Sequence, residues 1–262
     1  MTTVVPHAPD GSPEGKLAGK AVFVGGASRN LGALISRTLA DAGARVAVHY
    51  NSDSSAADAR SVVDAITSRG GEAFPLQADL TEPDQVKRAF DEVADRFGSL
   101  YASVNTAGMV IKKPLVEVTP AEYDRMFAVN SKAAFFVMQE AAKRVADGGK
   151  ILSVVTSLLA GYTGLYSVYA GSKAPVEDFT RALSKELFGR NVSVNTLAPG
   201  PMDTGFFYPA ETDESVAYLK SQAMNGELTK IEHIAPWVKF LLTDGWWANG
   251  QVFFLNGGFT TR

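Results

Sequence analysis

Short apolar, β-prone runs alternate with amphipathic segments along most of this 262-residue chain. We expect strands at residues 21–25, 44–50, 72–78, 100–105, 150–155, 192–198 and 251–256, and helices at 31–42, 56–69, 84–97, 121–146, 173–188 and 231–242. Strands that are apolar throughout must be covered on both faces. The alternation therefore predicts an α/β fold with one doubly wound parallel sheet of about seven strands and helices on both faces.

The composition excludes several classes of protein. The 25 basic and 28 acidic residues give a net charge of −3, without the basic excess of a nucleic-acid binder. The chain has no cysteine and three scattered histidines, so we expect neither a disulfide nor a metal site. No apolar run approaches the ~20 residues of a membrane span, and the N-terminus lacks the pattern of a signal peptide. We therefore expect a cytoplasmic protein that binds neither nucleic acid nor membrane.

The amino-acid composition changes once along the chain. Residues 1–18 hold three prolines and two glycines among small polar residues, which predicts a flexible tail. Residues 19–262 contain no repeat and no low-complexity linker. We expect one domain over 19–262.

A glycine-rich loop, Gly25 to Gly32, follows the first predicted strand and leads into a helix. Glycine lets the backbone approach a pyrophosphate, and the helix N-terminus offers free N–H groups. The loop therefore predicts nucleotide binding, with a structural turn as the alternative. The residues of this loop that we expect to contact the cofactor are Gly26, Ser28, Arg29, Asn30 and Leu31.

This loop resembles the TGxxxGxG motif of the short-chain dehydrogenase/reductase family. Gly25 replaces the usual Thr, and Asn30 replaces the middle Gly, which is tolerable because Asn adopts positive φ more readily than other non-glycine residues. The resemblance implies a single-domain Rossmann fold that binds a dinucleotide and reversibly reduces a ketone to a secondary alcohol, similar to 3-oxoacyl reductases. It also implies a homotetramer built through the long helices and the C-terminal strand.

The end of the second predicted strand bears on the choice of dinucleotide. An acidic residue there would bind the ribose hydroxyls of NAD and repel a 2′-phosphate. Tyr50 holds that position, although Asp53 lies close enough to interfere. Arg29 in the glycine loop, with Asn51 and Ser52, suits a phosphate, unless Arg29 is only a solvated loop cation. The sequence therefore predicts NADP(H) in preference to NAD(H).

Three further segments resemble cofactor contacts of the family. Residues 79–80 match its adenine-binding segment, with a turn or capping carboxylate as the alternative. Residues 105–108 resemble its NNAG motif, and residues 199–204 resemble its PGxxxT segment, which holds the nicotinamide carboxamide. The residues implied by these matches are Asp79, Leu80, Asn105, Ala107, Gly108, Pro199, Gly200, Met202 and Thr204.

Tyr169 and Lys173 match the YxxxK pair of the family and would share one face of a helix. A free phenol, with a pKa of about 10, is a weak acid–base partner at neutral pH. We expect the Lys173 ammonium and the oxidised nicotinamide to lower the pKa of Tyr169, which would then exchange a proton with the substrate oxygen. Lys173 would also hold the nicotinamide ribose, so both residues are expected to contact the cofactor.

Two more polar residues complete the expected catalytic group. Ser157 follows a predicted strand and resembles the serine that orients the substrate carbonyl; it lies twelve residues before Tyr169, whereas Thr156 has the commoner spacing of thirteen and is the alternative. Asn130 lies within an apolar helical stripe, so its amide needs partners. It belongs either to a structural network or, as the resemblance implies, holds a water that relays protons to Lys173.

The substrate is less well defined. Apolar residues near these motifs favour a small hydrophobic carbonyl or alcohol, and the resemblance implies a mobile lid at residues 205–225. The expected substrate contacts are Leu159, Tyr162, Tyr166 and Phe206. The alternatives are a catalytically silent NADP-binding sensor or scaffold, and an imine or enone reductase. Pro175, inside the expected helix 173–188, has no explanation at this level.

Overall fold

Seven strands form one parallel sheet in the computed structural model, which describes residues 16–161 and 163–261. The strand order is β3-β2-β1-β4-β5-β6-β7, and every neighbouring pair is parallel. The strands are β1 (Ala21–Gly25), β2 (Arg45–Tyr50), β3 (Glu72–Gln77), β4 (Leu100–Asn105), β5 (Val145–Val154), β6 (Ser193–Pro199) and β7 (Val252–Leu255). The predicted single-domain, doubly wound fold is confirmed.

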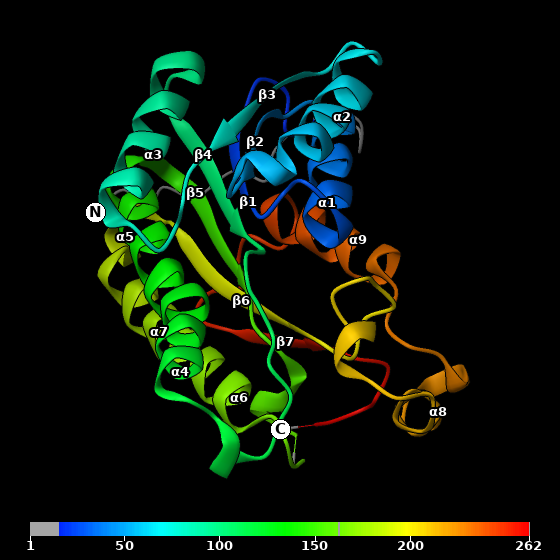
Figure 1. Cartoon of the computed structure of the whole chain (residues 1–262). Helices are drawn as coiled ribbons and strands as arrows, with labels where there is room; N and C mark the ends of the chain where they lie inside the picture. Colours follow the sequence, from blue (N-terminus) through cyan, green and yellow to red (C-terminus); the bar gives the residue numbers. More distant parts are fainter. Residues whose placement is uncertain (1–15, 162, 262) are drawn as a thin grey trace.

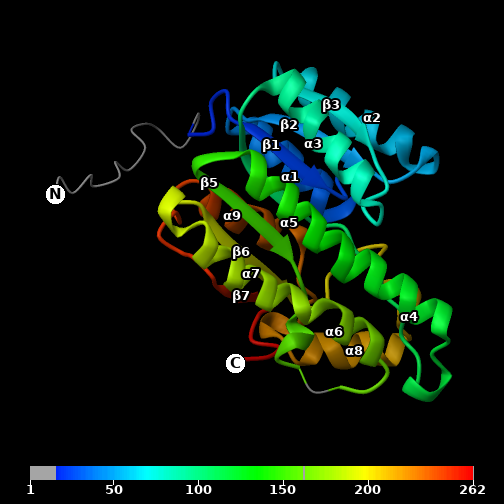
Figure 2. The ribbon, with the colours of Figure 1, turned by 90° about the vertical axis from the view of Figure 1, so that its left-hand side faces the viewer.

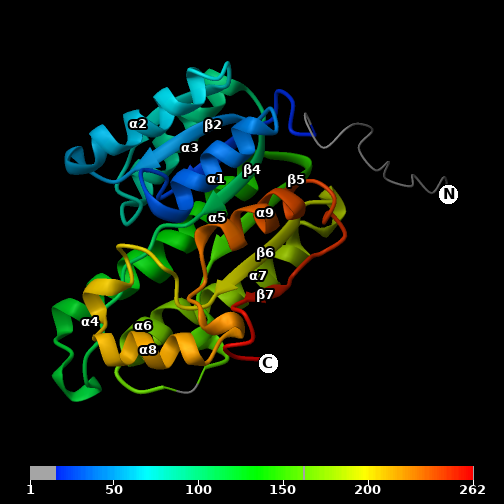
Figure 3. The same cartoon turned by 90° about the vertical axis from the view of Figure 1, so that its right-hand side faces the viewer.

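Helices cover both faces of the sheet (Figure 1). On one face lie α1 (Asn30–Asp41), α2 (Ala56–Thr67) and α9 (Ile231–Leu242), which face the viewer in Figure 3. On the other lie α3 (Pro83–Phe97), α5 (Ala133–Arg144) and α7 (Pro175–Glu186), in front in Figure 2. Alternate side chains of β1 supply the two cores, because Phe23 packs in one apolar cluster and Val22 and Val24 pack in the other.

The strand order reverses between β1 and β4, which opens a crevice at the carboxyl ends of the strands. Three shorter helices gather beyond that end, ahead of the arrowhead of β5 in Figure 2. They are α4 (Pro120–Phe127), α6 (Ser167–Lys173) and α8 (Asp213–Ser221). The helix α8 lies in the segment 205–225, where we expected a lid and no helix. No helix within the described residues is long and apolar enough to cross a membrane.

The flexible tail expected over residues 1–18 extends too far into the sequence. Leu17 is fully buried, and its N–H donates to the Ala42 carbonyl at 3.1 Å. The Lys16 ammonium pairs with Asp244 at 2.5 Å. Residues 16–18 therefore belong to the folded domain, whereas residues 1–15 lie outside the described part of the chain.

Two of the predicted helices are interrupted. The helix expected over 121–146 is α4, a π-helical segment (Ala128–Lys132) and α5, and β5 already begins at Val145. The helix expected over 173–188 is interrupted near its start, because α6 ends at Lys173 and α7 begins at Pro175. Pro175 opens α7 while Ala174, with φ −58° and ψ −42°, continues the helical path. Proline is tolerated in a first turn, where its missing N–H costs little, and this explains its presence.

Candidate active site

The glycine loop after β1 packs closely against the segment after β4. Gly26 has a φ of +71°, and a Cβ atom there would lie 2.9 Å from the Ala107 nitrogen. The Thr106 hydroxyl donates to the Gly25 carbonyl at 2.7 Å. Asn30 has a φ of +48°, so the predicted tolerance of asparagine at this position is confirmed. The loop thus needs small residues in the way that a close-approach nucleotide loop does.

The first turn of α1 has no side-chain cap, so its N–H groups are available to an anion. Arg29 precedes this turn and is exposed, and its guanidinium makes no hydrogen bond or ion pair to residues 16–161 or 163–261. Ser28 is half-buried beside it, whereas Leu31 is buried, so only the Leu31 backbone can face a ligand. Backbone donors and one exposed cation therefore lie together here.

His49, at the end of β2, joins the glycine loop to the segment after β3. Its Nδ1 accepts from the Gly26 N–H at 3.0 Å, and its Nε2 lies 2.9 Å from the Ala78 carbonyl. Burial lowers the pKa of His49 to about 4, so the ring is neutral at pH 7 and Nε2–H donates. We did not predict this bridge, although a histidine within the apolar run 44–50 was a signal for it.

Asp79, Asn51 and Ser52 lie at the ends of the neighbouring strands. The Asp79 carboxylate accepts from the Thr81 N–H at 2.9 Å and the Thr81 hydroxyl at 2.8 Å, which is the turn carboxylate that we considered as the alternative. Contact of Asp79 with adenine stays a prediction, and Leu80 is buried. Asn51 is exposed and Ser52 is partly exposed, as phosphate donors must be.

Asp53 is turned toward β3. Its carboxylate accepts from the Gln77 side-chain amide at 3.0 Å. This hydrogen bond holds toward β3 the carboxylate that could oppose a 2′-phosphate near Asn51 and Ser52.

The segment after β4 meets the catalytic candidates. Asn105 is buried and accepts from the Ala107 N–H at 3.1 Å. A Cβ on Gly108 would lie 2.9 Å from the Lys173 Nζ and 3.1 Å from the Asn130 Oδ1. Glycine is therefore required for this backbone to pass so close to both side chains.

Asn130 lies in the π-helical segment and is 1% exposed. Its amide nitrogen donates to the Met109 carbonyl and the Ser172 hydroxyl, both at 2.9 Å, and its oxygen accepts from the Met109 N–H at 2.9 Å. The structural network that we considered is therefore present, and it joins the loop after β4 to α6. The water relay stays a prediction.

Tyr169 and Lys173 are both buried on α6, and the Lys173 ammonium donates to the Val154 carbonyl at 3.0 Å. Burial raises the pKa of Tyr169 to about 12, against the lowering effect of the Thr156 hydroxyl, and lowers the pKa of Lys173 to about 8. Burial penalises the charged form of each group. The fall in the pKa of Tyr169 expected from Lys173 and a bound oxidised nicotinamide stays a prediction.

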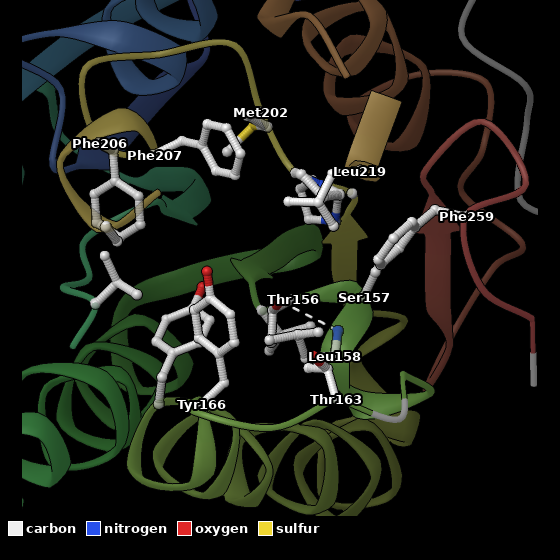
Figure 4. A pocket seen from close by; sticks show the side chains of 17 residues that line it. Thr156, Ser157, Leu158, Thr163, Tyr166, Met202, Phe206, Phe207, Leu219 and Phe259 are labelled. Carbon is white, nitrogen blue, oxygen red and sulfur yellow. Dashed lines mark hydrogen bonds between the residues drawn. The ribbon is translucent and has the colours of Figure 1, made fainter. Parts of the chain in front are cut away.

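The two hydroxyls after β5 have different partners. The Ser157 hydroxyl donates to the Ala198 carbonyl at 2.8 Å and accepts from the Asn256 side chain at 3.0 Å. The Thr156 hydroxyl accepts from the Leu158 N–H at 3.2 Å, drawn dashed in Figure 4, and acts on the phenol of Tyr169. The geometry therefore favours Thr156 as the hydroxyl beside the Tyr169 phenol, whereas the role expected of Ser157 stays a prediction.

The segment after β6 completes the crevice. Pro199, Gly200 and Met202 line a cavity there. The Thr204 hydroxyl is buried and finds no partner among the described residues. A buried hydroxyl without a partner costs free energy, which a bound ligand would recover. Thr204 thus fits a carboxamide, as expected for this position.

The cavity lies over Tyr169 and between the segments after β5 and β6. In Figure 4, Met202, Phe206 and Phe207 face Tyr166 and Leu158 across it. No charged side chain of the described residues lines it.

The structure places the expected substrate residues differently. Tyr166 and Phe206 line the cavity, as predicted. Leu159 does not, because it packs against the apolar cluster that contains Phe23. Tyr162 lies outside the described residues. Phe259 lines the cavity although we did not predict it, since its contribution depends on the C-terminal turn folding back. Nowhere in the described chain do three His, Asp or Glu side chains group as metal ligands would.

Comparisons with known proteins agree with this geometry. A family model described as enoyl-(acyl carrier protein) reductase matches residues 26–260. A short-chain type dehydrogenase/reductase of Picea abies is 40% identical, over 92% of this chain and 93% of its own. A chloroplastic NADPH-dependent aldehyde reductase-like protein of Arabidopsis thaliana is 36% identical, over 97% and 98%. A dehydrogenase structure from Burkholderia cenocepacia with bound NADP is 49% identical, with a TM-score of 0.92 over 95% and 96%.

Proposed function

Because the chain belongs to the short-chain dehydrogenase/reductase family, whose members are NAD(P)-dependent oxidoreductases acting on CH–OH and C=O groups, we propose that it reversibly reduces a small hydrophobic ketone with NADP(H). The observation that carries the proposal is the buried phenol of Tyr169, which opens beside the Thr156 hydroxyl into an uncharged cavity. An apolar site with a few convergent polar groups is suited to binding and orienting a small carbonyl compound.

Tyr169 is the proton donor in reduction. When bound, the dinucleotide supplies the hydride for the carbonyl carbon. The Tyr169 phenol is protonated at neutral pH, and the Lys173 ammonium with the bound oxidised nicotinamide would lower its raised pKa, so that it can exchange its proton with the carbonyl oxygen as negative charge develops there. In alcohol oxidation the same oxygen takes the proton back.

Thr156 orients the carbonyl. Its hydroxyl lies beside the Tyr169 phenol, where it can turn its hydrogen to the substrate oxygen, whereas the hydrogen of Ser157 is used on Ala198. Ser157 instead supports the site by joining β6 to Asn256 near the chain end. This assigns Thr156 the contact with substrate that we first expected of Ser157.

Lys173 and Asn130 resupply the proton and hold the cofactor. An ammonium has three donors, and one of them binds Val154, which leaves two for the nicotinamide ribose hydroxyls. The pKa of about 8 lets Lys173 exchange a proton near neutral pH. Asn130 fixes the backbone of Met109 alongside and would hold the relay water.

Two features support a dinucleotide in the crevice, and a third supports the phosphorylated form. The uncapped first turn of α1 suits the pyrophosphate, and the unpartnered Thr204 hydroxyl suits the carboxamide. The exposed Arg29 with Asn51 and Ser52 suits a 2′-phosphate, and relatives that bind NADP or use NADPH favour it too.

The cavity favours a small apolar substrate. Its volume is about 110 Å³. An apolar cavity of roughly 150 Å³ accepts benzene, so a substrate with a single ring is of the right scale. The segment 205–225, which carries Phe206 and Phe207 to the cavity, is the proposed lid.

The test is a substrate panel of hexanal, benzaldehyde, cyclohexanone, 2-tetralone, a cyclic imine and cyclohexenone, each with NADPH and with NADH. We expect carbonyl reduction, faster with NADPH, that Tyr169→Phe lowers by about 10²–10⁴-fold. Tight NADPH binding without turnover of any compound would instead identify a silent sensor. Turnover of only the imine or the enone double bond would identify the other alternative.

A further inference from the structure

The segment 205–225 contains a carboxylate whose side chain has no exposed surface. This residue, Glu211, lies between the turn at Tyr208–Ala210 and α8. A buried carboxylate is costly unless it is paired and hydrogen-bonded. The Lys112 ammonium pairs with its Oε2 at 2.5 Å, and this pairing lowers the pKa of Glu211 despite the opposing effect of burial.

Two hydroxyls complete the environment of this carboxylate. The Tyr166 phenol donates to Oε1, and the Ser215 hydroxyl donates to Oε2. The Lys112 Nζ also lies 5.4 Å from the centre of the Tyr166 ring. One carboxylate thus joins α8, the loop after β4 and the residue that precedes α6.

Tyr166 links this cluster to the substrate. Its ring lines the cavity in Figure 4, and the ring centres of Tyr166 and Tyr169 are 6.0 Å apart. A phenol whose hydroxyl is held by a buried, charge-balanced carboxylate cannot rotate away without breaking a strong hydrogen bond. The orientation of this wall of the cavity therefore depends on Glu211.

We propose that Glu211 is a positioning residue that determines substrate affinity. It fixes the Tyr166 ring as a wall of the cavity and ties the lid to the loop that carries Lys112. Glu211 contacts neither Tyr169 nor Lys173 in any hydrogen bond of the described residues, so it affects binding of the carbonyl compound and not proton transfer. This inference rests on the proposed reductase function.

The experiment compares Glu211→Gln, Tyr166→Phe and the double variant, using the compound of the panel that the wild type reduces fastest. We expect KM for that compound to rise about tenfold in each single variant, as for the loss of one charge-assisted hydrogen bond. We expect kcat and KM for NADPH to stay close to wild type. Because the two side chains act as a unit, the double variant should resemble the single variants.

The matched controls are Glu214→Gln and Tyr218→Phe, which change exposed residues of α8. Both should keep wild-type kinetics. An unchanged KM in Glu211→Gln would overturn the inference. A joint loss of kcat, NADPH affinity and thermal stability would also overturn it, because it would indicate a general structural role.

A wild-type protein that reduces nothing in the panel would contradict the proposed function, and the structural part of this inference, the hold of Glu211 on α8, is then tested by itself. In that case trypsin cleavage after Lys220 in α8 reports whether Glu211 still holds this segment to the loop that carries Lys112. Glu211→Gln should be cleaved faster than both wild type and Glu214→Gln. Equal cleavage rates would overturn the inference.

Discussion

His49 acts at the scale of a single residue, because one imidazole connects two of the strand ends expected to meet the cofactor. It accepts from Gly26 in the glycine loop and donates to Ala78, beside Asp79. Its backbone carbonyl also accepts from the Ala27 N–H at 2.8 Å. The neutral ring is needed for this, since a protonated ring would present a second donor to the Gly26 N–H.

The pKa of His49 makes stability depend on pH. The folded-state pKa of about 4 lies below the ordinary histidine pKa of 6.5, so the unfolded chain binds more protons between these values. The contribution of His49 to the free energy of unfolding should be fully present above pH 6.5, and about 3 kcal/mol of it should be lost as the pH falls to 4. In urea titrations His49→Asn should lack this loss, whereas exposed His233→Gln should retain it. A loss of equal size in His49→Asn would contradict the assignment.

The hydroxyls of Thr156 and Ser157 differ in the group that they meet, because Thr156 acts on the Tyr169 phenol and Ser157 donates to the Ala198 carbonyl. Thr156→Val should lower kcat by about 10²–10³-fold, as for the removal of one donor to a developing oxyanion. Ser157→Ala should keep most of kcat but lower unfolding free energy by about 1–3 kcal/mol, because it leaves the Asn256 amide short of a partner. Steady-state kinetics and urea unfolding of both variants separate the two roles. Full activity in Thr156→Val would return the role to Ser157.

At the scale of elements, the α6–α7 junction shows how one proline sits inside a continuous helical path. Pro175 is at the start of α7, where the helix loses a single hydrogen bond, and Ala174 still donates to the Ala170 carbonyl at 3.0 Å. The path therefore keeps Tyr169 and Lys173 on one helix and α7 against β6. An α6 separated from α7 by a loop would not hold these two side chains as firmly.

This geometry predicts that Pro175→Ala changes unfolding free energy by less than about 1 kcal/mol, because the proline already fits its backbone. The matched control is Ala182→Pro, at an exposed position inside α7, which should cost about 3 kcal/mol or more. Urea unfolding followed by circular dichroism measures both. A large loss in Pro175→Ala would mean that the proline itself supports the site.

At the scale of the whole molecule, α9 and β7 leave aromatic surface exposed at one edge of the sheet. Trp237 is 42% and Phe240 is 46% exposed, and the rings of Trp237 and Phe253 lie 6.3 Å apart. Beside an edge strand, such a surface is typical of an interface between subunits. The homotetramer implied by the resemblance stays a prediction, and this surface is one place where its subunits would meet.

Light scattering should therefore give the mass of four chains for the wild type. Trp237→Glu should dissociate this assembly, because it buries a charge in an apolar interface. Tyr218→Glu, an equally drastic change at an exposed position of α8, should not. A monomeric wild type would contradict the expected assembly.

The sequence by itself determined that strands alternate with helices along the chain, and it determined the edge of the sheet where the motifs meet. It could do so because burial on two faces demands continuous apolar runs, and because parallel strands present their carboxyl ends together. Leu17, the π-helical segment at Asn130 and the hydrogen of Ser157 escaped prediction. Each depends on partners far along the chain, as Ser157 depends on Ala198 and Asn256.

Only the tertiary structure decided which polar groups pair. Glu211 and Lys112 are 99 residues apart, and no local periodicity indicates that a carboxylate of the segment 205–225 and an ammonium of the loop after β4 will be buried together. Local patterns reflect which side chains must leave water, whereas the choice among nearby hydroxyls and charges follows from hydrogen-bond geometry after the chain has closed.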